Sequence, residues 1–116
     1  MILPSIHCVL IDDDFLVRKT WEMASKTAGL HIRTFATLSE FETLSASLNK
    51  DVKIFVDYRL EEGSGIEVTR TLFDRGFGNL YLATGMRECD LPPLSEIPWI
   101  KEIGGKEPYF IGGVSS

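Results

Sequence analysis

Apolar residues along this chain fall into short runs that alternate with longer amphipathic segments. Residues 6–11, 30–35, 52–56, 80–83 and 99–103 form the apolar runs. Each run is short enough to be one buried strand, and the segments between the first four have the periodicity of helices. Strands that alternate with helices are typical of an α/β protein with a parallel sheet. The pattern therefore predicts a doubly wound, five-stranded parallel sheet.

The amphipathic segments carry recognisable helix signals at their ends. A helix is predicted over residues 15–28, and it ends at Gly29, a residue suited to the left-handed conformation of a helix C-terminus. Residues 37–40 and 64–67 read as capping boxes, which open helices that close near residues 49–51 and 76. The predicted apolar face of the first helix consists of Val17, Trp21, Ala24 and Ala28.

The alternation weakens after residue 85. Residues 86–98 contain Pro92, Pro93 and Pro98. Because proline removes a backbone donor, we expect a loop there with at most one short helical turn. Residues 106–116 are too few and too rich in glycine to predict a final helix. We therefore expect a sheet whose fourth and fifth helices are reduced or absent.

Composition narrows the classes of protein. A chain of 116 residues with 44% hydrophobic residues predicts one domain, residues 1–116, around one core. Its net charge of -5 and its scattered lysines and arginines argue against direct binding of nucleic acid or an anionic membrane. No apolar stretch approaches the roughly 20 residues that span a bilayer, and the first residues do not resemble a signal peptide. We expect a cytoplasmic protein.

Acidic residues follow two of the predicted strands. Asp12, Asp13 and Asp14 come directly after the first strand, and Asp57 comes after the third. In a sheet ordered 2-1-3-4-5 these two strands are neighbours at the topological switch point, where ligands bind. Carboxylates that converge there favour a hard divalent cation such as Mg²⁺. Asp14 immediately precedes the first helix, so we interpret it as an N-cap instead of a metal ligand.

Two further polar side chains are expected at the same edge of the sheet. Thr84 follows the fourth strand, and a lysine lies at or near the end of the fifth. This lysine is Lys106 or Lys101, of which Lys101 lies inside the predicted strand. Carboxylates, a hydroxyl and an ammonium group from different strand ends are the outline of a phosphoryl-transfer site.

These motifs resemble the receiver domain of two-component response regulators. The resemblance covers almost the whole chain and rests on four segments in order, residues 9–18, 55–65, 82–85 and 105–108. It implies a flavodoxin-like fold in which Asp57 is the phosphoacceptor. By the same resemblance, Asp13, Asp57 and the backbone carbonyl of Arg59 bind Mg²⁺, and Asp12 supports the metal through water.

The resemblance also implies roles for the remaining site residues and a signalling function. Thr84, the Gly85 backbone N–H and Lys106 would contact the phosphoryl group. Lys106 is favoured over Lys101 because Lys106-Glu107-Pro108 is similar to the family's Lys-Pro signature and its distance from Thr84 is closer to the family's usual one. A histidine kinase or a phosphotransfer protein would supply that group, and the domain would catalyse only its own phosphorylation and dephosphorylation. Ile103 occupies the position where the family usually carries a switch aromatic. We therefore expect an unusual output surface, which contacts an unknown output protein or a second copy of the chain.

Two alternatives stay open from the sequence. The first is a pseudo-receiver, a phosphorylation-independent interaction module that keeps the fold and loses the switch. The second is a small phosphotransferase of the haloacid dehalogenase type, suggested by the Asp12-x-Asp14 pattern, with Asp12 as the nucleophile. Such enzymes enclose their substrate under a cap, and this chain has no residues to spare for one.

Overall fold

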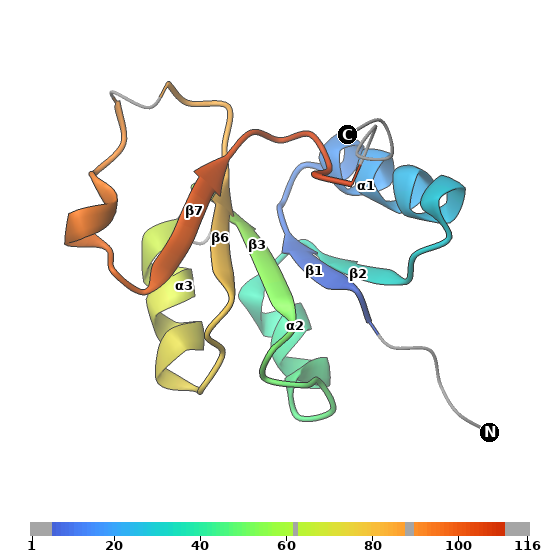
Figure 1. Ribbon diagram of the computed structural model, residues 1–116, viewed down its shortest axis with the longest axis horizontal. Helices are drawn as coiled ribbons and strands as arrows, with labels where there is room; N and C mark the ends of the chain where they lie inside the picture. The colour runs from blue at the N-terminus through green and yellow to red at the C-terminus, as the bar shows by residue number, and fades with distance from the viewer. Residues whose placement is uncertain (1–5, 62, 88–89, 111–116) are drawn as a thin grey trace.

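The computed structural model describes residues 6–61, 63–87 and 90–110 (Figure 1). In these residues five parallel strands form one sheet, in the order β2-β1-β3-β6-β7. The strands are β1 (Cys8–Ile11), β2 (Ile32–Phe35), β3 (Lys53–Asp57), β6 (Leu80–Ala83) and β7 (Ile100–Gly104). Counted along the chain, this order is 2-1-3-4-5, which confirms the predicted flavodoxin-like topology.

Three α-helices cover the sheet in the described part of the chain. They are α1 (Phe15–Ala28), α2 (Leu38–Ser45) and α3 (Gly65–Asp74). The helix α1 lies on one face of the sheet, and α2 and α3 lie on the other (Figure 1). This two-sided cover explains why β1 reads as a continuous apolar run, since all four of its side chains are fully buried.

The two faces of β1 lead into separate apolar clusters. Cys8 and Leu10 pack with Trp21 of α1, whereas Val9 and Ile11 belong to a larger cluster that includes Phe41 of α2 and residues of α3. This division follows from the pleat, because successive side chains of a strand point to opposite faces. Burying both faces fixes the register of β1, and with it the place where Asp12 emerges.

The helix ends follow the predicted signals, with two differences. Asp14 caps α1 by accepting the N–H groups of Leu16 and Val17, and Gly29 ends α1 at φ 72°. The helix α2 ends at Ser45, several residues before the predicted end. The predicted apolar face of α1 is also wrong at one position, since Ala28 is exposed in the last turn of the helix.

The fourth and fifth helices are reduced, as expected. Between β6 and β7 the described residues form only the short 3-10 turn η2 (Leu94–Glu96). Ile97 is buried in the larger apolar cluster, and Trp99 packs against that cluster and donates its indole N–H to Thr69 of α3, so these two side chains contribute apolar cover in place of a helix. After β7 no helix forms up to Phe110, the last described residue.

Aromatic rings lie on the α1 side of the sheet beyond β1. Phe55 of β3 stacks on Tyr81 of β6 and on Tyr109, with ring centroids 4.7 and 5.0 Å apart. The Lys53 ammonium lies 5.1 Å from the centre of the Tyr109 ring. Stacked rings bury apolar area and prefer such offset contacts, so they partly replace the missing cover of a helix.

One small element was not predicted. Strands β4 (Arg59–Leu60) and β5 (Gly63–Ser64) form a two-stranded antiparallel hairpin directly after β3. Two residues a side are too few to show a strand period in the sequence. Among the described residues, no helix has the length and apolar character needed to cross a membrane.

Candidate functional site

Three carboxylates converge at the carboxyl ends of β1 and β3. Asp12 and Asp13 follow β1, and Asp57 is the last residue of β3. The two strands pair in parallel with Ile11 opposite Val56, so Asp12 and Asp57 leave the sheet at the same level. One oxygen from each of the three carboxylates lies within 4.8 Å of the others. The structure thus brings together the three residues that the sequence pattern singled out.

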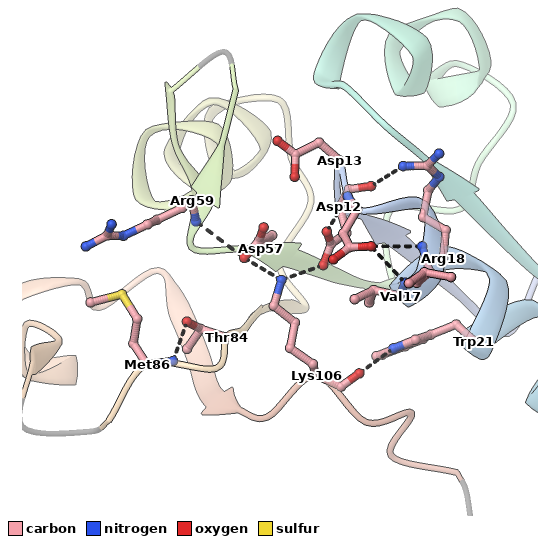
Figure 2. A network of polar contacts seen from close by, with 12 residues as sticks. Asp12, Asp13, Val17, Arg18, Trp21, Asp57, Arg59, Thr84, Met86 and Lys106 are labelled. Atoms are coloured by element: carbon pink, nitrogen blue, oxygen red, sulfur yellow. Dashed lines mark hydrogen bonds and ion pairs between the residues drawn. The ribbon is translucent and has the colours of Figure 1, made fainter.

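Lys106 bridges two of these carboxylates. Its Nζ lies 2.7 Å from Asp12 Oδ2 and 2.7 Å from Asp57 Oδ1 (Figure 2). Asp12 is fully buried and Asp57 is 7% exposed, so both charges depend on partners within the protein. Lys101, the alternative considered from the sequence, is exposed on β7. Lys106 is therefore the lysine that the fold delivers to the site.

Hydrogen bonds hold Asp12 and Asp13 in place. Asp12 Oδ1 accepts a hydrogen bond from the N–H of Asp14 at 2.9 Å, and the backbone carbonyl of Asp12 accepts one from the Arg18 guanidinium at 2.8 Å. Asp13 Oδ2 accepts the N–H of Glu61 at 2.7 Å, which ties the β4-β5 hairpin to the loop after β1. The unpredicted hairpin thus helps to orient one member of the acidic cluster.

Gly65 packs against the backbone of Asp57. Its N–H donates to the carbonyl of Tyr58 at 2.7 Å, and a Cβ at this position would lie 2.1 Å from the carbonyl oxygen of Asp57. A side chain cannot fit at that distance, so glycine is required for α3 to begin beside β3. The sequence shows a glycine here, but it does not show what lies opposite.

Thr84 and Gly85 line the other side of the site. Ala83 pairs with Asp57 across β6 and β3, which places Thr84 one residue beyond the carboxylate. Thr84 is buried, and its hydroxyl accepts the N–H of Met86 at 3.1 Å (Figure 2). A pocket of about 640 Å³ is lined by Thr84, Gly85 and Lys106 together with the aromatic residues of the α1 side. It gives the site an opening to solvent.

Burial and like charge raise the pKa of Asp57. Burial is the larger cause and the neighbouring Asp12 carboxylate adds to it, while the Lys106 ammonium opposes both. Burial lowers the pKa of Lys106, but its hydrogen bonds to Asp12 and Asp57 outweigh this, and the net direction is upward. Burial and the Asp12 charge therefore make the ionised form of Asp57 less favourable in the folded protein, while the two carboxylates favour the charged form of Lys106.

This cost predicts that Asp57→Asn stabilises the metal-free protein. A raised pKa in the folded state means that stability falls as the pH rises through that pKa, so a negative charge on Asp57 lowers the stability of the metal-free fold. Asparagine removes the charge and keeps an oxygen for Lys106. We expect the melting temperature in EDTA to rise by roughly 2–5 °C.

Thermal unfolding at pH 7 measures the effect. Asp51→Asn is the matched control, because Asp51 is exposed and its substitution should leave the melting temperature within about 1 °C. A lower melting temperature for Asp57→Asn than for the wild type would contradict this description of the cluster's electrostatics.

Comparison with known proteins gives the fold a family context. No protein-family model and no curated protein sequence matches the chain. Several solved structures do match it, over most of its length. The response regulator StyR is 20% identical with a TM-score of 0.69, and the alignment covers 97% of this chain and 56% of StyR. The receiver domain of the TMAO respiratory system response regulator TorR is 18% identical with a TM-score of 0.73. That alignment covers 95% of this chain and 91% of the TorR domain.

A third similar structure comes from a complex. The receiver domain of the Saccharomyces cerevisiae response regulator Ssk1, co-crystallised with the histidine phosphotransfer signalling protein Ypd1, is 13% identical with a TM-score of 0.72 and coverages of 99% and 87%. At these identities the likeness shows the fold, and the chain has the fold of response regulator receiver domains. The chain spans about half the length of StyR and most of the two receiver domains.

Proposed function

We propose that residues 1–116 form a receiver domain that accepts a phosphoryl group on Asp57 in a reaction that needs Mg²⁺. The observation that carries the proposal is the cluster of Asp12, Asp13 and Asp57 with Lys106 at the carboxyl edge of a receiver-type sheet. A structural role for these aspartates would not require three carboxylates within 4.8 Å of one another, only two of which pair with the Lys106 ammonium group.

The donor set fits Mg²⁺. Three carboxylates against one lysine leave two uncompensated negative charges, and hard oxygen ligands at this spacing suit a small divalent cation. We assign Asp13, Asp57 and the backbone carbonyl of Arg59 as direct ligands and Asp12 as a ligand through water. Bound Mg²⁺ would neutralise charge on the phosphoryl oxygens during transfer.

The other steps of phosphoryl transfer depend on residues of the chain. A carboxylate oxygen of Asp57 attacks the phosphorus atom, and the bond from phosphorus to the histidine nitrogen of the donor breaks, with its electron pair staying on the nitrogen. The product is an acyl phosphate on Asp57. Lys106 exchanges its contact with Asp57 for a phosphoryl oxygen, while the Thr84 hydroxyl and the Gly85 N–H donate to another. Hydrolysis of the acyl phosphate returns the free carboxylate.

The partners follow from this chemistry. The donor is a histidine kinase or a histidine phosphotransfer protein, and the similar Ssk1 receiver was crystallised with such a phosphotransfer protein. The domain catalyses its own phosphorylation and dephosphorylation and no other reaction. Phosphorylation changes a surface that contacts an output protein or a second copy, and the role implies a cytoplasmic location.

The dehalogenase-type alternative has less support. That alternative rests on the Asp12-x-Asp14 pattern with Asp12 as the nucleophile, but the Asp14 carboxylate accepts two backbone N–H groups as the cap of α1. Asp12 is fully buried, and its two oxygens are engaged by the Asp14 N–H and by Lys106. A nucleophile needs a free and accessible oxygen.

Locating the phosphoryl group distinguishes the candidates. The protein is incubated with acetyl phosphate and Mg²⁺, and peptides are mapped by mass spectrometry after reductive trapping of the acyl phosphate. A label on Asp57 supports the receiver, whereas a label on Asp12 supports the dehalogenase type. An unlabelled protein under all conditions supports the pseudo-receiver and contradicts the proposal.

A further inference from the structure

Trp21 connects α1 to the backbone of Lys106. Its indole Nε1–H donates to the carbonyl oxygen of Lys106 at 2.8 Å, across 85 positions of the chain (Figure 2). The Trp21 side chain is 1% exposed and lies on the α1 side of the sheet. A buried indole N–H needs an acceptor, and here the acceptor belongs to the lysine that bridges Asp12 and Asp57.

The segment that carries Lys106 is held mainly by side-chain packing, since its described residues form no regular backbone element after β7. It follows β7 and crosses from the edge of the sheet toward α1, with no helix in its described residues (Figure 1). Tyr109 and Phe110 meet the Trp21 ring at centroid distances of 6.4 and 5.8 Å, and Phe55 meets it at 5.2 Å. Trp21 is thus the common contact of the loop, the sheet and α1.

Lys106 is consequently held at both ends. Its ammonium group contacts the carboxylates, and its carbonyl contacts the Trp21 indole. Lys106 follows two glycines, Gly104 and Gly105, so its backbone gains conformational freedom if the carbonyl is released. The ammonium group then spends less time in contact with Asp12 and Asp57. Ring packing alone would fill the space under the loop but would not fix this carbonyl.

We propose that Trp21 is a positioning residue for Lys106, which acts through its indole N–H to hold the lysine at the phosphoacceptor site. The proposal rests on the proposed function for its effect on phosphoryl transfer, but the Trp21–Lys106 link itself does not. Loss of one neutral hydrogen bond is expected to slow transfer about fivefold, equivalent to about 1 kcal/mol.

The first test compares two identical substitutions. Trp21→Phe keeps a ring and removes the N–H, and Trp99→Phe removes the other indole of the chain, whose N–H donates to Thr69 on α3 at 3.0 Å. With acetyl phosphate and Mg²⁺, the rate of adduct formation should fall about fivefold in Trp21→Phe and stay within about twofold in Trp99→Phe. Equal rates in the two variants would overturn the proposal.

The second test keeps Trp21 intact and needs no phosphorylation. The chain has two tryptophans, so its ¹H–¹⁵N spectrum contains two indole signals, which Trp99→Phe assigns. Asp57→Asn should shift the Trp21 signal and leave the Trp99 signal in place. In a Lys106→Met background the same change at Asp57 should no longer move the Trp21 signal, because the ammonium group that contacts Asp57 is gone.

The two tests separate the possible failures. An Asp57→Asn substitution that leaves the Trp21 signal unmoved, or that moves it equally with and without the Lys106 ammonium, overturns the positioning role. An absent phosphoryl adduct in the wild type overturns the proposed function instead, and the indole signals then still decide whether Trp21 is linked to Asp57 through Lys106.

Discussion

Replacing Lys106 with methionine is expected to destabilise the metal-free protein by about 2–3 kcal/mol, or roughly 10–15 °C in melting temperature. Lys106 is the shared partner of buried Asp12 and Asp57. Methionine keeps the aliphatic stem and removes the charge, which leaves two neighbouring carboxylates without their cation. We place the effect below that of a fully buried pair, because the Lys106 side chain is 29% exposed.

Mg²⁺ should restore most of the loss, since a divalent cation compensates the same carboxylates. The measurement is thermal unfolding in EDTA and in millimolar Mg²⁺, with Lys101→Met as the matched control. Lys101 is exposed on the same strand-to-loop segment, and its substitution should change stability by less than about 0.5 kcal/mol. Equal melting temperatures for the Lys106 and Lys101 variants in EDTA would contradict the bridging role of Lys106.

Gly65→Ala should be the most damaging single-methyl change near the site. The added Cβ would lie 2.1 Å from the carbonyl oxygen of Asp57. The backbone fixes the positions of both atoms, so neither can rotate away. Either α3 or the end of β3 must move, which costs about 3 kcal/mol at the upper end of typical overpacking. The displacement also reaches the carboxylate cluster, so we expect weaker Mg²⁺ binding as well as a lower melting temperature.

Gly78→Ala is the control for this prediction. A Cβ at Gly78 meets nothing within 4 Å, and its substitution should be neutral to within about 0.5 kcal/mol. Chemical denaturation of the two variants in EDTA and Mg²⁺ titration of the folded proteins give both readouts. If Gly65→Ala unfolds at the same denaturant concentration as Gly78→Ala, the close approach of α3 to Asp57 is not a constraint on this fold.

The sheet and its helices were predictable because their signals are local. Apolar runs of strand length, the caps at Asp14, Thr37 and Ser64, and the left-handed Gly29 each act over a few neighbouring residues. The sheet order was implied by the resemblance to receiver domains, and it agrees with the placement of ligand carboxylates at the switch point of doubly wound sheets. The strands and helix ends themselves required no knowledge of which residues meet across the fold.

The missing parts of the prediction depend on contacts between distant segments. The hairpin after β3 has two residues per strand and is stabilised by the bond from Glu61 to Asp13, 48 positions away. The role of Gly65 depends on the carbonyl of Asp57, and that of Trp21 depends on Lys106. The sequence placed Trp21 on the buried face of its helix but could not show where its N–H points.

The choice between Lys101 and Lys106 depends on both local sequence and contacts between distant segments. The resemblance to receiver domains favoured Lys106, and the structure provides the physical reason. β7 ends at Gly104, so Lys106 lies in the loop beyond the strand, where its side chain reaches back over the sheet edge to Asp12 and Asp57. Lys101 lies within β7 and is exposed to solvent.

Phosphorylation of Asp57 is the central claim of this account, and intact-mass spectrometry after incubation with acetyl phosphate tests it most directly. The wild type and Asp57→Asn are each measured with Mg²⁺ and with EDTA. We predict one phosphoryl adduct on the wild type with Mg²⁺ and none in the other three samples. An adduct of equal yield on Asp57→Asn, or no adduct on a folded wild-type protein with Mg²⁺, would contradict the claim.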